Sequence, residues 1–343
     1  MASKTRNTNI ELLRLLCIIM IISMHIFGLY KDNLGTAGIA ALSFNNAVCN
    51  MGVSIFMLIS GYYGIRFKSA KLLDLVNIAL FWSLVLFAVD VDHSAKNIVR
   101  SIFPVSTGKY WFLTAYIIIA CLAPFVDKML SQVTKRQFMT LIIVLSMFFV
   151  VAPSFLMLEI MHDSGKGIMN MLLVYLIGRY MAVYGLPKRL TGLTGGGILL
   201  LTILIVTGVD FAITYRFGIP FQMLARDNSF FILLGAIIVF TMVMAMRPRT
   251  VSWVNEIASY VFPIYVIHGS LLHRLTFIPD NMHNILYLMV WANAISIALM
   301  AIVLEYVRRK LLTPVFNLLL QKETSLLVFV KTKLLPKEEK PIE

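Results

Sequence analysis

Arg14 and His25 are the residues of this chain whose types and spacing point most directly to chemistry. They stand eleven residues apart in one apolar run, Ile10–Leu29, which is long enough to cross a bilayer. At about 100° per residue, that spacing brings a helix back to within about 20° of its starting face and raises it by about 16 Å. One face of the predicted helix therefore carries a guanidinium group and, about 16 Å further on, an imidazole.

Both side chains are costly inside a membrane. An arginine near the bilayer centre costs about 2.5–3.5 kcal/mol on insertion scales, so such groups usually face a protein interior or a water-filled cavity and take part in function. Arg14 could instead extend to the nearer membrane surface beside Glu11, one turn earlier. His25 could instead make one hydrogen bond between packed helices. The sequence leaves these alternatives open.

The composition is that of a polytopic membrane protein. The chain has 343 residues, of which 59% are hydrophobic and 14% are charged, whereas soluble domains carry about 25% charged residues. We therefore expect an all-α integral membrane fold with about ten transmembrane helices. The expected spans are Ile10–Leu29, Phe44–Ile65, Leu72–Val89, Tyr110–Phe125, Phe138–Leu158, Ile168–Tyr184, Gly197–Tyr215, Ser229–Met246, Ile257–Phe277 and Ile285–Val307.

The basic residues predict the orientation of these spans. With the N-terminus in the cytoplasm, 22 of the 30 Lys and Arg residues fall on the cytoplasmic side and 8 fall outside. Both termini are therefore expected inside, and the net charge of +13 reflects topology rather than binding to nucleic acid. We expect a transmembrane domain over residues 1–307 and a cytoplasmic tail over 308–343 that is amphipathic, lies at the membrane interface and ends in disorder.

A second intramembrane imidazole, His268, lies in the segment SYVFPIYVIH of the span Ile257–Phe277. In the predicted orientation His268 and His25 occupy similar depths in the outer half of the membrane, where two imidazoles could support proton transfer. Tyr265 adds a polar group to this segment, and Pro263 is expected to kink the helix below His268. A single packing hydrogen bond is the alternative role for His268.

Three further segments give weaker signals. IFMLISG ends with Ser60 and a glycine, and small residues of this kind favour close helix packing. KYWFLTAY contains Tyr110 and Trp111, which suit an aromatic belt at the membrane surface. RFKSAK contains Arg66 and Lys68, which could meet an anionic phosphate and equally fit a basic cytoplasmic loop. No CxxC or HExxH pattern is present, and we expect no metal.

Taken in chain order, these segments resemble the membrane acyltransferase-3 family, bacterial enzymes that acylate cell-surface glycans. The family signatures are an acidic residue followed by Arg and then His, an FFxxSG segment, a WYL-like segment and a late SYxIYLxH segment. Here they are matched by Glu11, Arg14 and His25, by IFMLISG, by Tyr110-Trp111-Phe112-Leu113, and by Ser259 to His268. The family often carries several arginines after the second span, where this chain has Arg66, Lys68 and Lys71, and lysine offers a point charge in place of a bidentate fork.

The resemblance implies an acyltransferase of the bacterial inner membrane, surrounded by lipid. The donor would be a cytoplasmic acyl-CoA, expected to be acetyl-CoA, and the acceptor a hydroxyl of a surface polysaccharide or a lipid-linked saccharide. His25 would act as general base or transient acyl carrier, with Arg14 and His268 as the other catalytic residues. The implied substrate-binding residues are Glu11, Ser60, Tyr110, Trp111, Tyr265, Arg66 and Lys68. A transporter of a glycan or small solute, without acyl-transfer chemistry, fits ten spans equally well.

Overall fold

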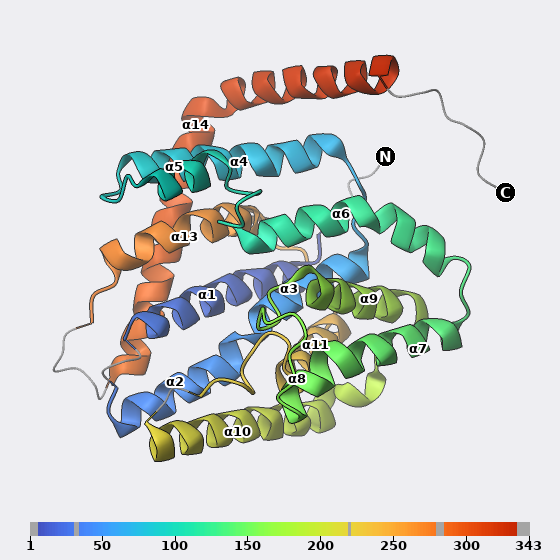
Figure 1. Ribbon diagram of the computed structural model, residues 1–343, viewed down its shortest axis with the longest axis vertical. Helices are drawn as coiled ribbons and strands as arrows, with labels where there is room; N and C mark the ends of the chain where they lie inside the picture. The colour runs from blue at the N-terminus through green and yellow to red at the C-terminus, as the bar shows by residue number, and fades with distance from the viewer. Residues whose placement is uncertain (1–5, 31–33, 219–220, 279–284, 335–343) are drawn as a thin grey trace.

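The computed structural model describes residues 6–30, 34–218, 221–278 and 285–334, and every regular element in these ranges is a helix, as expected (Figure 1). The helices are α1 (Thr8–Tyr30), α2 (Thr36–Cys49), α3 (Met51–Tyr63), α4 (Ser69–Ala88), α5 (Ala95–Ile102), α6 (Trp111–Leu130), α7 (Lys135–Ser146), α8 (Ala152–Phe155), α9 (Ile168–Tyr184), α10 (Gly192–Phe217), α11 (Phe230–Ala245), α12 (Ser252–Ile257), α13 (Val261–Leu275) and α14 (Leu286–Leu334). A π-helical stretch, Met147–Val151, joins α7 to α8. Helices suit these apolar runs because they satisfy their own backbone hydrogen bonds in lipid.

The membrane spans follow the apolar runs. Within the described residues, seven helical stretches are long and apolar enough to cross a membrane, and α9 and α11 are shorter apolar helices. The seven are Thr8–Tyr30, Thr36–Tyr63, Ser69–Ala88, Trp111–Leu130, Lys135–Phe155, Gly192–Phe217 and Leu286–Val330. Eight of the ten expected spans each fall on a single helix, whereas Phe44–Ile65 covers the end of α2 and α3, and Phe138–Leu158 covers α7, the π-helical stretch and α8. The chain is a multi-pass membrane protein. The span expected over Ile257–Phe277 is the 15-residue helix α13, because a 3-10 turn over Ala258–Tyr260 delays its start.

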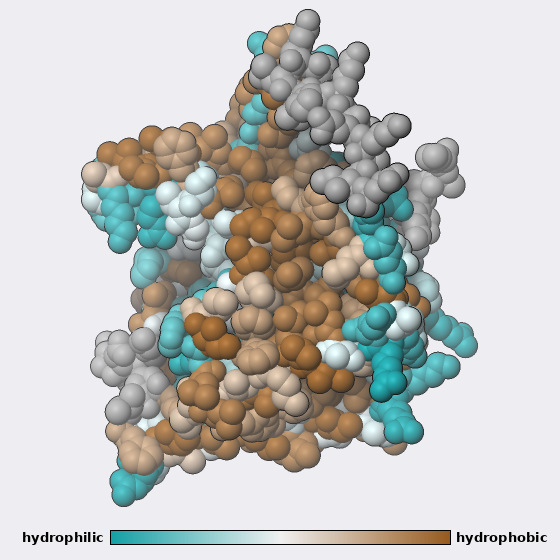
Figure 2. All heavy atoms as spheres, turned by 45° about the vertical axis from the view of Figure 1, so that its right-hand side comes forward, coloured by the Kyte–Doolittle hydropathy of each residue, from teal (hydrophilic) through white to brown (hydrophobic). Residues whose placement is uncertain are grey.

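Apolar side chains gather in a band on the surface of the molecule. Figure 2 shows hydrophobic residues in a broad vertical band on this face, with hydrophilic patches on both sides of it. The axes of α1, α4 and α10 run across the vertical direction in Figure 1. Leu200 and Leu204 of α10 are more than half exposed, as expected for side chains that face lipid. This arrangement matches the hydrocarbon core of a bilayer.

Helix α1 lies in the middle of the bundle and packs against α3, α13 and α14 (Figure 1). Its apolar side chains Ile22 and Ile26 are fully buried. The costly side chains of α1 are therefore enclosed by neighbouring helices rather than by lipid, which is how membrane proteins usually accommodate ionisable groups.

Two glycines bring α3 and α9 into backbone contact. A Cβ atom added to Gly61 would lie 2.2 Å from the carbonyl oxygen of Tyr175, and one added to Gly178 would lie 2.6 Å from that of Leu58. Only a residue without a side chain fits at such a crossing. The glycine that follows Ser60 therefore serves the close helix packing predicted from the sequence.

Helix α14 continues without interruption through residue 308, where the sequence predicts the start of a tail. Figure 1 shows its last part turning away from the first part and lying alongside α4, and Pro314 lies inside the helix between them. Asn77 of α4 donates a hydrogen bond to Glu323 at 2.7 Å, and the rings of Phe81 and Phe316 lie 5.6 Å apart. The first part of the predicted tail is thus packed on the bundle, while residues 335–343, where disorder is expected, lie outside the described residues.

Candidate active site

Arg14 and His25 line the same cavity, which has a volume of about 1100 Å³. The shared helical face predicted from their spacing is therefore present. Arg14 is fixed by an ion pair with Glu11, in which its Nη1 lies 2.8 Å from Oε2 of the carboxylate. The side chain of Glu11 is largely buried, so it neutralises the guanidinium within the protein rather than at its surface.

At the His25 end of the cavity, two imidazole rings lie next to each other. The rings of His25 and His268 stack with centroids 5.5 Å apart and an angle of 25° between their planes. Nδ1 of His268 lies 2.7 Å from the carbonyl oxygen of Tyr265 and 3.2 Å from that of Ile264. Because a carbonyl oxygen only accepts hydrogen bonds, Nδ1 must carry the proton. In neutral His268 this leaves Nε2 as a hydrogen-bond acceptor.

His25 is free to meet a substrate. Its side chain is exposed to the cavity, and among the described residues neither ring nitrogen has a hydrogen-bond partner. A catalytic base must reach the proton that it removes, and an unpartnered imidazole on a cavity wall meets this requirement.

Aromatic side chains form the wall next to His268. Tyr265 and Trp111 both line the cavity, and the backbone N–H of Leu113 donates to the hydroxyl of Tyr265 at 3.4 Å. This contact fixes the start of α6 against α13. Tyr110 is buried behind Tyr265, with ring centroids 6.1 Å apart, and does not line the cavity.

Basic side chains gather at the Arg14 end of the cavity. Arg66 and Lys68, which follow α3, line it together with Arg6 and Lys71. Ser60 also lines the cavity, and its hydroxyl donates to the carbonyl oxygen of Phe56 at 2.9 Å. Of the residues expected at the site, the structure thus brings nine to one cavity and leaves Tyr110 behind its wall; the nine are Glu11, Arg14, His25, Ser60, Arg66, Lys68, Trp111, Tyr265 and His268.

The sequence does not predict a buried ion cluster that lies beside the start of α13. Pro263 has no N–H to donate to the carbonyl oxygen of Ser259, four residues earlier. Arg309 of α14 takes that place, donating to the Ser259 carbonyl oxygen at 3.0 Å and to its hydroxyl at 2.9 Å. Arg309 and Arg308 both pair with Glu305, which is fully buried. The proline thus marks a docking point for α14 beside the start of α13.

Two loops add charged side chains to the cavity that were not expected there: Lys166 and Asp227. They come from the loop before α9 and the loop before α11. No local pattern in the sequence distinguishes either one, because loops far apart in the chain bring them together.

Comparison with known proteins gives one match. The sequence model of a family described as an acyltransferase domain matches residues 7–307, a range that contains every lining residue named above except Arg6. No curated protein and no solved structure matches the chain.

Proposed function

The chain belongs to the acyltransferase 3 family and is therefore a transferase, and from this premise we propose that it moves an acetyl group from cytoplasmic acetyl-CoA to a hydroxyl of an extracytoplasmic or lipid-linked glycan. The observation that carries the proposal is a single cavity lined by basic side chains around Arg14 and by the stacked pair of His25 and His268. Family membership favours this class over a transporter without acyl-transfer chemistry.

The basic end of the cavity suits the donor. Coenzyme A carries phosphate groups, which Lys and Arg bind through charge-assisted hydrogen bonds. Arg66 and Lys68 would hold these phosphates, and Arg14, oriented by Glu11, would contact polar groups of the pantetheine arm of the donor. The arm would extend along the face of α1 and bring the thioester to His25.

His25 would act as the general base. It takes the proton from the acceptor hydroxyl, whose oxygen attacks the thioester carbonyl carbon. The new carbon–oxygen bond forms, the carbon–sulfur bond breaks, and the proton held by His25 returns to the thiolate of coenzyme A. An acyl-His25 intermediate is the alternative course: it would accumulate without acceptor, whereas the general-base course would not.

The excess of basic residues supports a cytoplasmic position for both termini, because 22 of the 30 Lys and Arg residues then lie inside. In this orientation Arg14 lies toward the cytoplasm and His25 toward the outside. The donor and the acceptor would therefore reach opposite ends of one cavity.

Purified protein incubated with radiolabelled acetyl-CoA and glycan extracted from the source cell tests the proposal. We expect label to appear as a base-labile ester on the glycan, with one free coenzyme A released for each ester. Movement of glycan across the membrane without release of coenzyme A would instead support the transporter.

A further inference from the structure

The loop over residues 156–167, which precedes α9, is held in an unusual backbone conformation. Met157, His162 and Ser164 have φ values of 57°, 50° and 56°. Residues other than glycine rarely adopt positive φ, and they persist there only where the surrounding structure fixes them, often next to a functional site. Something must therefore hold this loop in place.

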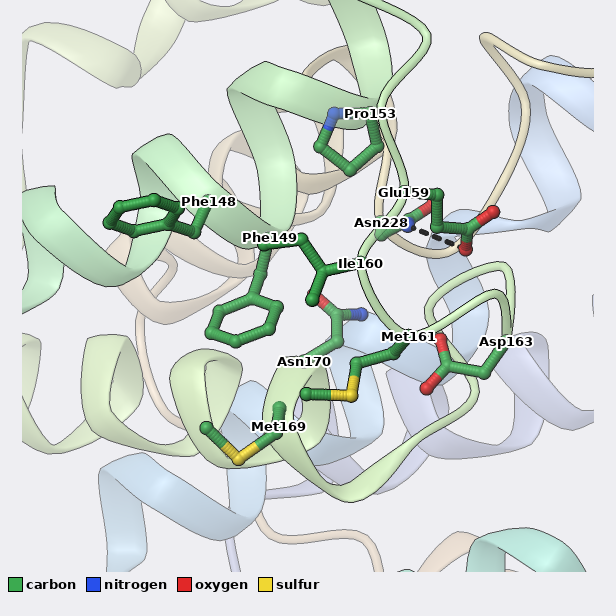
Figure 3. Close-up of a pocket in the computed structure, with 10 residues that line it drawn as sticks. All are labelled: Phe148, Phe149, Pro153, Glu159, Ile160, Met161, Asp163, Met169, Asn170 and Asn228. Atoms are coloured by element: carbon green, nitrogen blue, oxygen red, sulfur yellow. Dashed lines mark hydrogen bonds between the residues drawn. The ribbon is translucent and has the colours of Figure 1, made fainter.

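The loop over residues 221–229, which precedes α11, supplies that support. Glu159 accepts hydrogen bonds from Arg226 and from Asn228, both at 3.1 Å, and Figure 3 shows the contact with Asn228. A Cβ atom added to Gly165 would lie 2.3 Å from the backbone nitrogen of Asn228. The two loops are thus packed into one unit.

This unit presents Lys166 and Asp227 to the cavity that His25 and His268 also line. Lys166 lies close enough for its charge to act on both His25 and Asp227. The two packed loops therefore place an ammonium group and a carboxyl group at the histidine end of the cavity.

Neither side chain forms an ion pair within the described part of the chain. Asp227 is 5% exposed, and its Oδ1 has no hydrogen-bond partner among the described residues. No carboxylate oxygen in the described part of the chain lies within 4.0 Å of the Lys166 ammonium. Burial raises the pKa of Asp227 to about 7, and the charge of Lys166 opposes that rise. A buried acceptor of this kind gains most from a ligand that donates a hydrogen bond to it.

We infer that Lys166 and Asp227 form the subsite that orients a carbohydrate acceptor in front of His25, an inference that rests on the proposed function. Asp227 accepts a hydrogen bond from a sugar hydroxyl next to the one that is acylated, and Lys166 donates to a neighbouring hydroxyl or ring oxygen. A sugar suits this pair because adjacent carbons offer both a donor and an acceptor.

Titration with glycan extracted from the surface of the source cell tests the subsite. The variants are Asp227→Asn, Lys166→Met and Lys166→Arg. Asp210→Asn is the matched control, because Asp210 is also a buried carboxyl but does not line the cavity. Two rates are measured with radiolabelled acetyl-CoA: acyl transfer to the glycan, and hydrolysis of acetyl-CoA without glycan.

We expect Asp227→Asn, which keeps an acceptor oxygen but loses its charge, to raise the half-saturating glycan concentration by about tenfold. Lys166→Met, which loses the donor, should raise it by about tenfold or more. Hydrolysis without glycan should stay at the wild-type rate, which a merely structural role would not allow. The half-saturating glycan concentration of Lys166→Arg should lie between those of the wild type and Lys166→Met. Asp210→Asn should have the wild-type value.

The subsite would be overturned if the half-saturating glycan concentration stayed at the wild-type value in both Asp227→Asn and Lys166→Met. It would also be overturned if both variants lost acyl transfer and hydrolysis to the same extent. In either case active transfer by the wild type would leave the proposed function standing. A wild-type protein that acylates no glycan would overturn the proposed function and the subsite together.

Discussion

The rings of His25 and His268 stack with centroids 5.5 Å apart, although α1 and α13 lie far apart in the chain. The Nδ1–H of His268 donates a hydrogen bond to the carbonyl oxygen of Tyr265, while His25 has no hydrogen-bond partner among the described residues. The two imidazoles are therefore not equivalent. His268 is fixed in one orientation, and His25 remains available to a substrate.

Replacing His25 with alanine should abolish acyl transfer, because general-base catalysis contributes about 10²–10⁴-fold to rate. The variant should reach the membrane at the wild-type level, since the side chain is exposed to the cavity and makes no hydrogen bond with another described residue. The measurement is label transfer from acetyl-CoA by equal amounts of purified protein. Activity retained by His25→Ala would contradict the assignment of the base.

The role of Nε2 of His268 can be tested separately from that of Nδ1 by replacing the residue with asparagine. In His268→Asn the side-chain amide can still donate to the Tyr265 carbonyl oxygen, but the atom equivalent to Nε2 is missing. We expect this variant to fold and to lose at least about tenfold in transfer rate, if Nε2 takes part in proton transfer. Equal rates for His268→Asn and wild type would reduce His268 to a packing residue.

Arg14 should act on the donor. Arg14→Gln is expected to raise the KM for acetyl-CoA by about tenfold, because a charge-assisted hydrogen bond is lost, while the half-saturating glycan concentration stays unchanged. Arg14→Lys keeps the positive charge but not the bidentate guanidinium group, so its KM for acetyl-CoA should lie between those of the wild type and Arg14→Gln. If Arg14→Gln changed the half-saturating glycan concentration and left the KM for acetyl-CoA unchanged, the assignment of the two ends of the cavity would be reversed.

Gly61 should be intolerant of a methyl group. A Cβ atom at this position would lie 2.2 Å from the Tyr175 carbonyl oxygen, so Gly61→Ala must push α3 and α9 apart. We expect a loss of about 1–3 kcal/mol in stability, visible as a lower Tm of the purified protein. Gly28→Ala is the control, because nothing lies within 4 Å of a Cβ atom there. Equal Tm values for both variants would contradict the close helix crossing.

The buried cluster on α14 should stabilise the bundle. Removing one member of a buried ion pair leaves its partner uncompensated, which costs about 3–5 kcal/mol. Glu305→Gln, which strands Arg308 and Arg309, should therefore lower the Tm strongly. Glu256→Gln, at an exposed position without an ion pair among the described residues, should leave the Tm unchanged.

Hydropathy predicts where the helices lie, because each apolar run must satisfy its backbone within lipid. It does not predict how they cross. The contact between Gly61 and Gly178 depends on backbone positions that no local pattern encodes. For the same reason the hydropathy of the tail did not show that its first part continues α14 and packs on α4 through Asn77 and Glu323.

The sequence likewise predicts some residues of the candidate site and not others. Arg14 and His25 could be paired from the sequence because one helix fixes their spacing. Lys166 and Asp227 could not, because the two loops that carry them meet only in the folded chain. Tyr110 matched a motif but lies behind Tyr265, since a motif fixes the order of residues and not the direction of each side chain.

The central claim is that an acyl group passes through one cavity from a donor on one side of the membrane to an acceptor on the other. Proteoliposomes with extracted glycan sealed inside and radiolabelled acetyl-CoA added only outside test it most directly. We expect labelled ester on the enclosed glycan with wild-type protein and none with His25→Ala. Ester that forms only when glycan and acetyl-CoA share one compartment would contradict the account.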